Sequence, residues 1–271
     1  MKEFILKLYK KISRTANKEN KIEIIEIKSS NELRMRLIRE NLMRKTWKVN
    51  FRRKIYEILS EDVDFVVKMD KNKENINDIH QIEVDVKRTC PNEEISKKLI
   101  KMLIKFSNEN GQIGYCQGMS DIGYHILCWF DDKNAYKIFS NVIIRREQMY
   151  KIDLDINNEI MLKQLGTLKS LEFNLFSLLK DHTEINIIIY RWLLTCFTRF
   201  ETIKDKVWDY LIFYDLDVIY LFTVAIIKYF ETDIILCKNV DELIILMNKI
   251  EYNQIEINLL LTIVDTYREN Y

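Results

Sequence analysis

Residues 111–130 read Gly-Gln-Ile-Gly-Tyr-Cys-Gln-Gly-Met-Ser-Asp-Ile-Gly-Tyr-His-Ile-Leu-Cys-Trp-Phe and hold four of the protein's five glycines. Glycine loosens a helix start and lets another backbone or a ligand approach closely. From residue 115 onward apolar residues recur at helical spacing, which predicts a helix with one face toward the core. That face comprises Tyr115, Met119, Ile122, Ile126, Trp129 and Phe130. The other face carries Gln117, Ser120 and Asp121, and taken alone Gln117 is a solvated residue at a frayed helix end.

Composition favours a helical protein with one large domain or two small ones. The 271 residues are 48% hydrophobic and 11% aromatic, enough for a substantial core. Proteins with as few helix breakers as one proline and five glycines are typically built of helices joined by short polar loops. No alternation of strands with crossover helices is visible, and no repeat of fixed period. The sequence therefore predicts an all-α fold.

Charge and reactive residues argue against several functions. Forty-two Lys and Arg against forty-one Asp and Glu leave a formal charge of +1, so no basic field favours nucleic-acid binding. Five cysteines without a Cys-x-x-Cys pair predict reduced core thiols in a cytosolic protein. The three histidines are scattered and do not form a zinc-binding pattern with paired cysteines. A Cys-His catalytic dyad remains an alternative, although no particular pair suggests one. No stretch has the roughly 20 apolar residues that a membrane-spanning helix needs. The apolar part of the N-terminus is too short for a secretory signal.

The chain is expected to divide at residue 30. Residues 1–30 begin with a basic amphipathic pattern and end in a polar connector, and residues 31–271 form the main helical domain. The N-terminal pattern suits an anionic membrane surface or a partner, or, as we favour, a first helix packed on the domain.

Helical spacing predicts most elements of the main domain. Residues 31–60 are helical and basic, and residues 61–79 form a surface loop. A helix starts after Asn92, with Glu93 and Glu94 in its first turn, and ends near residues 108–111. Further helices are expected at 135–150, 160–179, 184–200, 203–213, 216–230, 240–250 and 255–267.

A second motif precedes the glycine-rich stretch. It reads Ile82-x-x-Asp85-x-x-Arg88 and ends at Pro91. In a helix Asp85 and Arg88 share a side, so the carboxylate can hold and aim the guanidinium. An isolated pair of this kind is commonly an exposed salt bridge that contributes under about 1 kcal/mol.

Together, and in this order, the motifs resemble the TBC-domain family of Rab GTPase-activating proteins. The resemblance covers about residues 32–230, within the domain of residues 31–271. Its pieces are Arg44-x-x-Trp47, Ile82-x-x-Asp85-x-x-Arg88, Tyr115-x-Gln117-Gly-Met-x-Asp121, and Tyr190-Arg-Trp-Leu-Leu-Thr-Cys-Phe197 followed by Val207-Trp-Asp209. The resemblance implies an all-α fold with helical N- and C-terminal lobes.

The resemblance also implies roles for named residues. Arg88 would be an arginine finger and Gln117 a glutamine finger, both inserted into the nucleotide site of a GTP-bound Rab. Asp85 would anchor Arg88, and Tyr115 and Asp121 would hold the turn that carries Gln117. The protein would then be a GTPase activator and not an independent enzyme, acting in the cytosol at endomembranes during vesicle traffic.

No phosphate-binding loop or dinucleotide fingerprint is present in the sequence. We therefore expect no cofactor or metal of the chain's own, because GTP and magnesium would belong to the partner GTPase. Two alternatives stay open: a catalytically silent TBC-like adaptor, and a helical scaffold without a GTPase partner.

Two positions depart from the family pattern. Cys90 stands where the family usually has phenylalanine in Thr-Phe-Pro, which removes an aromatic contact beside Arg88. The arginine of the first motif usually lies one residue further from the tryptophan, where Met43 stands, and Arg34 offers an alternative placement.

Overall fold

Helices form all the regular structure in the part of the chain that the computed structural model describes. It describes residues 33–35, 37, 42–59, 76–150, 154–214 and 218–270. The elements are η1 (Leu42–Arg44), α3 (Val49–Leu59), α4 (Ile76–Thr89), α5 (Glu93–Glu109), α6 (Met119–Leu127), α7 (Asp132–Ile144), α8 (Glu147–Tyr150), α9 (Leu154–Leu171), α10 (Phe173–Leu179), α11 (Thr183–Leu194), α12 (Lys204–Phe213), α13 (Val218–Tyr229), α14 (Glu231–Ile235), α15 (Val240–Lys249), η2 (Ile250–Tyr252) and α16 (Ile257–Asn270). The all-α prediction is confirmed. Residues 1–30 lie outside the described residues, so the boundary at residue 30 stays a prediction.

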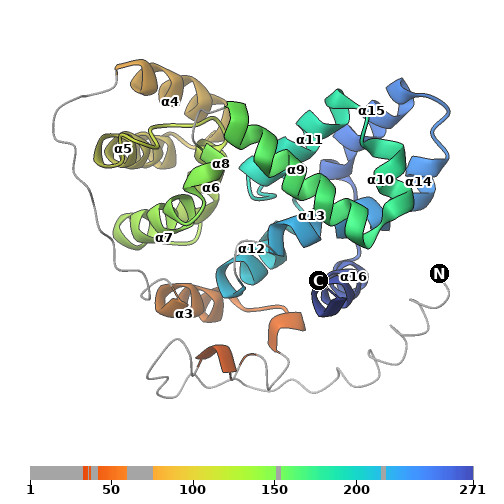
Figure 1. Cartoon of the computed structure of the whole chain (residues 1–271). Coiled ribbons are helices and arrows are strands. Elements are labelled where there is room, and N and C mark those ends of the chain that lie inside the picture. The colour runs from red at the N-terminus through yellow and green to blue at the C-terminus, as the bar shows by residue number, and fades with distance from the viewer. Residues whose placement is uncertain are drawn as a thin grey trace.

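The helices form two groups along the chain (Figure 1). In the first, α4 packs on α5 and α6, and α7 packs on α5 and α6. In the second, α13 contacts α9, α11, α12 and α16. Helix α3 contacts α12 of the second group and α7 of the first, so it bridges the two.

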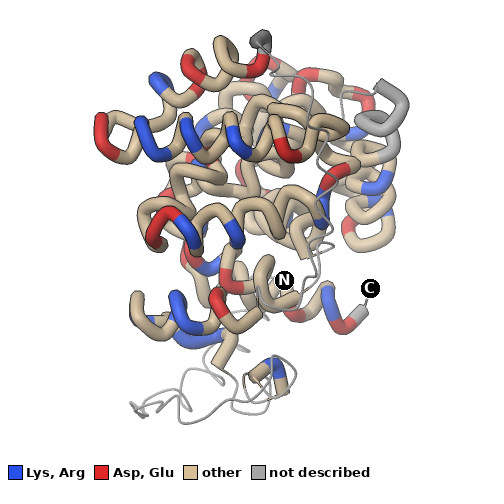
Figure 2. The backbone as a smooth tube through the Cα atoms, turned by 90° about the vertical axis from the view of Figure 1, so that its left-hand side faces the viewer, with Lys and Arg blue, Asp and Glu red and all other residues tan. Residues whose placement is uncertain are grey.

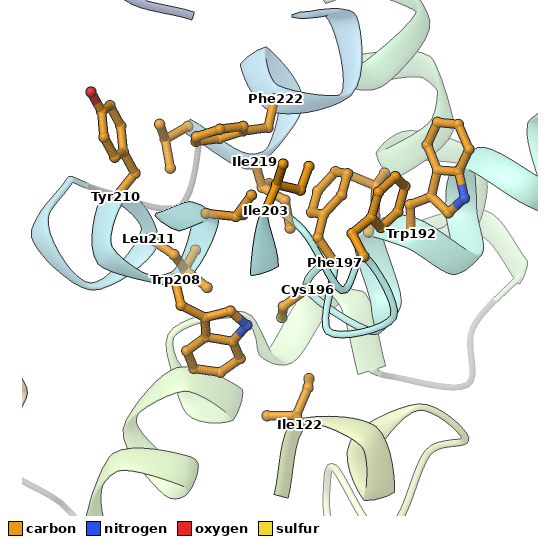
Figure 3. Close-up of a cluster of buried hydrophobic side chains, with 14 of the residues drawn as sticks. Ile122, Trp192, Cys196, Phe197, Ile203, Trp208, Tyr210, Leu211, Ile219 and Phe222 are labelled. Atoms are coloured by element: carbon orange, nitrogen blue, oxygen red, sulfur yellow. The ribbon is translucent and has the colours of Figure 1, made fainter. Parts of the chain in front are cut away.

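The core of the second group surrounds α13. Every residue from Val218 to Lys228 is buried, as expected for a helix that other helices surround. Aromatic side chains from α11 and α12 pack beside it, with Ile122 of α6 reaching the same cluster (Figure 3). No described helix is both long and apolar enough to cross a membrane.

Charges of both signs are interspersed over the side of the molecule that carries α3, α4, α5 and α7 (Figure 2). This agrees with the formal charge of +1 for the whole chain. The described surface on this side therefore has no single-sign field of the kind that attracts nucleic acid.

Local signals placed several helices correctly. The Asn92 side chain caps α5 by accepting a hydrogen bond from the Ile95 amide at 3.0 Å, and α5 ends at Glu109 as expected. The prediction of a helix over 240–250 is matched by α15, which Asn239 caps in the same way.

Other predicted boundaries were wrong. The predicted helix from Tyr115 begins only at Met119, because Gly118 adopts a left-handed φ of 103° that no right-handed helix contains. The loop predicted up to residue 79 ends earlier, since α4 starts at Ile76. The predicted helix over 184–200 ends at Leu194, because Cys196 and Phe197 are left-handed with φ of 49° and 59°.

A buried ion cluster joins α3 to α12. Arg52 Nε lies 2.6 Å from Asp209 Oδ1, and Arg52 Nη2 lies 3.1 Å from Oδ2 of the same carboxylate. Tyr56 donates to Asp209 at 3.2 Å, and Lys206 lies 3.3 Å from it. Because every partner is buried or nearly so, Asp209 in the motif Val207-Trp-Asp209 is a structural residue.

The motif Arg44-x-x-Trp47 also contributes to packing within the protein. Arg44 pairs with Asp265 of α16, with nitrogen–oxygen distances of 2.8 and 2.6 Å. The buried Trp47 ring donates to the Leu42 carbonyl at 2.8 Å. Arg34, the alternative placement, donates to the Phe213 carbonyl at the end of α12.

Candidate functional site

Helix α4 presents Arg88 to solvent near its C-terminus. The Arg88 side chain is 72% exposed, whereas the Asp85 side chain is 5% exposed. Their closest nitrogen–oxygen distance is 4.0 Å, at the limit for an ion pair, so the guanidinium keeps its donors available. The other Asp85 oxygen accepts a hydrogen bond from the Tyr115 hydroxyl at 3.0 Å.

That hydrogen bond links α4 to the segment that carries Gln117. We call residues 114–118 the glutamine turn. Both of its glycines are left-handed, Gly114 with φ of 64° and Gly118 with φ of 103°. The Gln117 side chain is exposed, and Tyr115 is buried, so the turn anchors itself through its tyrosine and displays its amide.

Asp78, at the start of α4, holds the same turn from its other end. Its Oδ2 accepts hydrogen bonds from the Tyr115 amide at 3.0 Å and from the Ser107 hydroxyl. A Cβ added at Gly114 would lie 3.3 Å from this oxygen, which explains the glycine there. Two carboxylates of α4 therefore bind Tyr115. Asp78 accepts from the Tyr115 backbone amide, and Asp85 accepts from the Tyr115 hydroxyl.

A third connection joins α4 to the first turn of α6. Thr89 donates to the Asp85 carbonyl at 2.9 Å, and its hydroxyl lies 3.1 Å from the Ser120 hydroxyl. Ser120 is 1% exposed, so the prediction that it lies on the polar outer face is wrong. Its hydroxyl is buried because it has a hydrogen-bond partner on α4.

The end of α11 supports the glutamine turn from the second helix group. A Cβ at Gly118 would lie 3.5 Å from Thr195 and 3.6 Å from Leu194. After the two left-handed residues, the chain reaches Arg199, which forms a two-pronged pair with Asp121 at 3.1 and 3.2 Å. Asp121 thus holds the start of α6 through Arg199, a partner 78 residues away.

A hollow of about 930 Å³ opens beside Arg88. We call it the Arg88 hollow. Its lining includes Arg88, Thr89, Asp121 and Arg199, so α4, α6 and the segment after α11 all contribute. Gln117 does not line it. Arg88 and Gln117 are both exposed and belong to elements joined through Asp85 and Tyr115, but only Arg88 contributes to this hollow.

The pKa values of the titratable groups near the hollow are shifted in directions that disfavour nucleophilic catalysis. Burial, with smaller effects from Lys204 and Arg52, lowers the pKa of His125 to about 3, so the imidazole is neutral. Burial raises the pKa of the Cys128 thiol, and burial together with Asp85 raises the pKa of Cys116 to about 11. A reactive cysteine needs a lowered thiol pKa. Although His125 and Cys128 line the same hollow, they do not form an activated dyad.

Burial also raises the pKa of the Tyr115 hydroxyl, and the nearby Asp85 carboxylate adds to this effect. The hydroxyl therefore stays protonated and remains a donor to Asp85. Within the described ranges no three His, Cys, Asp or Glu side chains gather in a way that could hold a metal ion.

Sequence reasoning singled out Arg88, Gln117, Asp85, Tyr115 and Asp121 as candidates, but it did not single out Asp78 and Arg199, which contact the same elements. Asp78 was assigned to the surface loop, and only α4 brings it to residue 115. Arg199 has no local pattern that distinguishes it from any exposed arginine. The glycines at positions 114 and 118 were the local sequence signal that a close approach occurs at this turn, and in the structure both have a positive φ.

Comparison with known proteins places these features in context. The family model described as "Rab-GTPase-TBC domain" matches residues 9–235. Human TBC1 domain family member 2A is 25% identical over 179 residues, which cover 59% of this chain and 19% of that protein. Human TBC1 domain family member 2B is 27% identical over 175 residues, 57% of this chain and 17% of that protein. The match thus spans under a fifth of the length of these relatives.

A shorter relative and two solved structures give the same picture. Growth hormone-regulated TBC protein 1 of Xenopus laevis is 24% identical over 179 residues, 58% of this chain and 50% of that protein. The crystal structure of a Chlamydomonas flagellar RabGAP TBC domain superposes with a TM-score of 0.65 at 16% identity, covering 99% of this chain and 92% of the other. The Ypt/Rab-GAP domain of Gyp1p gives a TM-score of 0.60 at 13% identity, covering 98% and 99%. At these identities the two structures establish a shared fold.

Proposed function

The chain belongs to the Rab-GTPase-TBC domain family, and from that membership we propose that it accelerates GTP hydrolysis on a Rab-type small GTPase. In this proposal Arg88 and Gln117 act in trans as an arginine finger and a glutamine finger. Asp85, Tyr115 and Asp121 support them. The chain supplies catalytic residues to a partner and has no complete active site by itself.

One observation carries the proposal. Arg88 and Gln117 are exposed, while the groups that hold their two elements together are buried. Asp85 accepts a hydrogen bond from Tyr115 at 3.0 Å, so the two elements that carry the exposed side chains are joined through buried groups. Such an arrangement is costly to build for two residues that only face water, because it places a carboxylate in a buried position.

The chemistry of γ-phosphoryl transfer explains the two residue types. Catalysis in this reaction consists of positioning and charge stabilisation, and a guanidinium can neutralise charge on the transferring and leaving oxygens. A carboxamide can accept a hydrogen bond from the attacking water and donate another nearby, so it orients the nucleophile without a pKa near 7. Neither function needs a cofactor of this chain. GTP and magnesium would arrive with the GTPase.

The same reasoning suggests where the protein works. A Rab activator would act in the cytosol on membrane-attached GTPases during vesicle traffic. The basic amphipathic pattern of residues 1–30 would suit peripheral contact with those membranes.

A silent adaptor is the second candidate, and the substitution at position 90 favours it. Cys90 is buried, and its thiol donates to the Asn92 carbonyl at 3.3 Å, so it fills its place by packing and hydrogen bonding. Two residues away, Arg88 lacks the aromatic neighbour of the family pattern. If the lost contact loosens Arg88, the chain would bind a GTP-loaded Rab without accelerating hydrolysis.

Single-turnover phosphate release from a panel of GTP-loaded Rab proteins distinguishes these candidates. The chain is compared with its Arg88→Ala and Gln117→Ala forms. Arg53→Ala and Gln81→Ala are matched controls, because both residues are exposed on helices of the first part of the chain. We expect at least one Rab to respond, and each finger substitution to remove most of the acceleration. Binding of a GTP-loaded Rab without acceleration by the unaltered chain would establish the adaptor.

A further inference from the structure

A second hollow, about 570 Å³ in volume, lies between α9 and α11. We call it the apolar groove. Its wall includes Met161, Leu162 and Leu165 from α9, and Ile187 and Tyr190 from α11. Leu162 is 66% exposed and Ile187 is 63% exposed. Adjacent large apolar side chains that remain in water are typical of an interaction surface.

Helix α11 leads from this groove to the glutamine turn. Leu194 and Thr195, at its C-terminal end, lie against Gly118. Ile187 precedes Leu194 by seven residues, which is about 10 Å along the helix axis. Tyr190 lies between them, and burial together with the neighbouring Cys116 raises its pKa to about 12. Helix α11 therefore contributes residues to the apolar groove, and its C-terminal end lies against Gly118, the residue after Gln117.

We propose that the apolar groove is a docking surface for the GTPase on which Arg88 and Gln117 act, in its GTP-bound form. The inference rests on the proposed function. Standard protein interfaces bury about 800 Å² on each partner, which corresponds to a disc of radius about 16 Å. A GTPase whose nucleotide meets Gln117 has a footprint of this size, and Ile187 lies only about 10 Å along α11 from Leu194, which packs against Gly118. Such a footprint extends to the groove. Its contact there consists of apolar side chains next to its nucleotide site.

The composition of the groove favours a folded protein as its occupant. The groove is concave, and its exposed lining residues are Leu162, Ile187 and Thr183. None of them is basic, unlike a surface that binds anionic lipid. The Asn186 side-chain oxygen also lines it and is buried without a hydrogen-bond partner among the described residues.

The groove and the fingers then perform separate tasks. The fingers act on charge that develops in the transition state, so they determine the maximal rate. The groove contacts the GTPase equally before and during the reaction, so it determines affinity. Loss of the groove should raise the half-saturating concentration of the activator and leave the maximal single-turnover rate unchanged.

The test uses the full chain with Leu162→Asp or Ile187→Asp, and the milder Leu162→Ser and Ile187→Ser. Leu236→Asp is the matched control, because Leu236 is 70% exposed at the end of α14 and does not line the groove. Circular dichroism verifies folding. Single-turnover hydrolysis is measured on a responding Rab over a range of activator concentrations. We expect the aspartate variants to raise the half-saturating concentration about tenfold or more, with the maximal rate within about twofold of the parent and Leu236→Asp unchanged.

Several outcomes would overturn the inference. One is an unchanged half-saturating concentration in both aspartate variants, and another is an equal effect of Leu236→Asp. A third is a change from dimer to monomer by equilibrium sedimentation without a change toward the Rab, which would assign the groove to a second copy of the chain. If a Rab binds but is not accelerated, binding of its GTP-analogue form is measured instead. Binding lost in Ile187→Asp but kept in Arg88→Ala would support the docking surface while refuting the proposed catalysis.

Discussion

Two arginine–aspartate pairs in this protein have opposite environments. At the junction of α3 and α12, Arg52 and Asp209 have side-chain exposures of 7% and 0% and meet at 2.6 Å. At the end of α4, Arg88 and Asp85 have exposures of 72% and 5% and approach only to 4.0 Å. Arg52 also contacts Asp205 at 3.3 Å and lies 4.8 Å from the ring centre of Trp129.

The difference shows what leaves an arginine available to a partner. Arg52 has its donors engaged with carboxylates inside the protein, so its charge serves the fold. Asp85 instead accepts its shorter hydrogen bond from the Tyr115 hydroxyl, which leaves the Arg88 guanidinium loosely held and in water. The prediction that Asp85 anchors Arg88 therefore keeps only a weak geometric basis, and the anchoring of the glutamine turn by Asp85 is the stronger contact.

The largest expected effect concerns the exposed pair. Arg88→Ala should lower the single-turnover rate on a responding Rab by about 10³-fold or more, because a finger supplied in trans contributes about 10³ to 10⁵. The free energy of unfolding should change by no more than about 0.5 kcal/mol, since an exposed pair at this distance stabilises little. Phosphate release and urea unfolding measure the two quantities. A large loss of stability would contradict the comparison of the two arginines.

The buried pair should respond in the opposite way. Arg52→Ala should lower the free energy of unfolding by about 3 to 5 kcal/mol, because it leaves the Asp209 charge buried without its main partner. Urea unfolding followed by circular dichroism measures the loss. Arg53→Ala, next along α3 and exposed, is the control and should change stability by no more than about 0.5 kcal/mol. Equal stability of the two variants would show that the buried pair has no special role.

His125 lies between the two regions and should make stability depend on pH. Its pKa falls from the ordinary 6.5 to about 3 in the folded protein, where burial, Lys204 and Arg52 disfavour the charged ring. Between these values the unfolded chain binds the proton and the folded chain does not, so stability falls as pH is lowered below 6.5. From about pH 7.5 to about pH 5 we expect a loss of about 2 kcal/mol from this residue.

Urea unfolding at a series of pH values tests the contribution of His125. His125→Gln should flatten the decline relative to the parent. His80→Gln, which changes an exposed histidine on α4, should leave the decline in place. An identical pH profile for the parent and His125→Gln would contradict the prediction.

The smallest expected effect concerns the glutamine turn. Gly118→Ala places a Cβ on a residue with φ of 103°, which should cost about 1 to 2 kcal/mol and displace Gln117. Gly111→Ala is the control, because a Cβ there meets nothing within 4 Å and φ is not positive. Thermal unfolding and single-turnover hydrolysis are both measured. Wild-type activity in Gly118→Ala would show that the turn does not position the amide.

Much of the fold could be predicted from local patterns. The spacing of apolar residues and the capping residue Asn92 placed α5, and the same signals placed α15. These predictions hold because a helix hydrogen-bonds within itself, so its sequence contains its own start and much of its packing.

Boundaries that depend on distant contacts could not be predicted in this way. Helix α11 ends before the left-handed Cys196 and Phe197, although an apolar pattern continues through them. Left-handed geometry costs a residue other than glycine about 1 to 2 kcal/mol. The packing of the buried Phe197 and Phe200 rings, 5.3 Å apart, offsets that cost, and this packing has no local signature.

The sequence by itself determined that the protein is helical, that it resembles the TBC-domain family, and that Arg88 and Gln117 are its candidate fingers. Residue type and spacing are sufficient for those conclusions, because helix periodicity and family motifs are properties of the chain. Only the tertiary structure decided which arginine is exposed, that Asp78 and Asp85 both hold Tyr115, and that Asp121 pairs with Arg199. These contacts join residues 30, 37 and 78 positions apart, and a buried carboxylate acquires its partners only when the helices that carry them pack together.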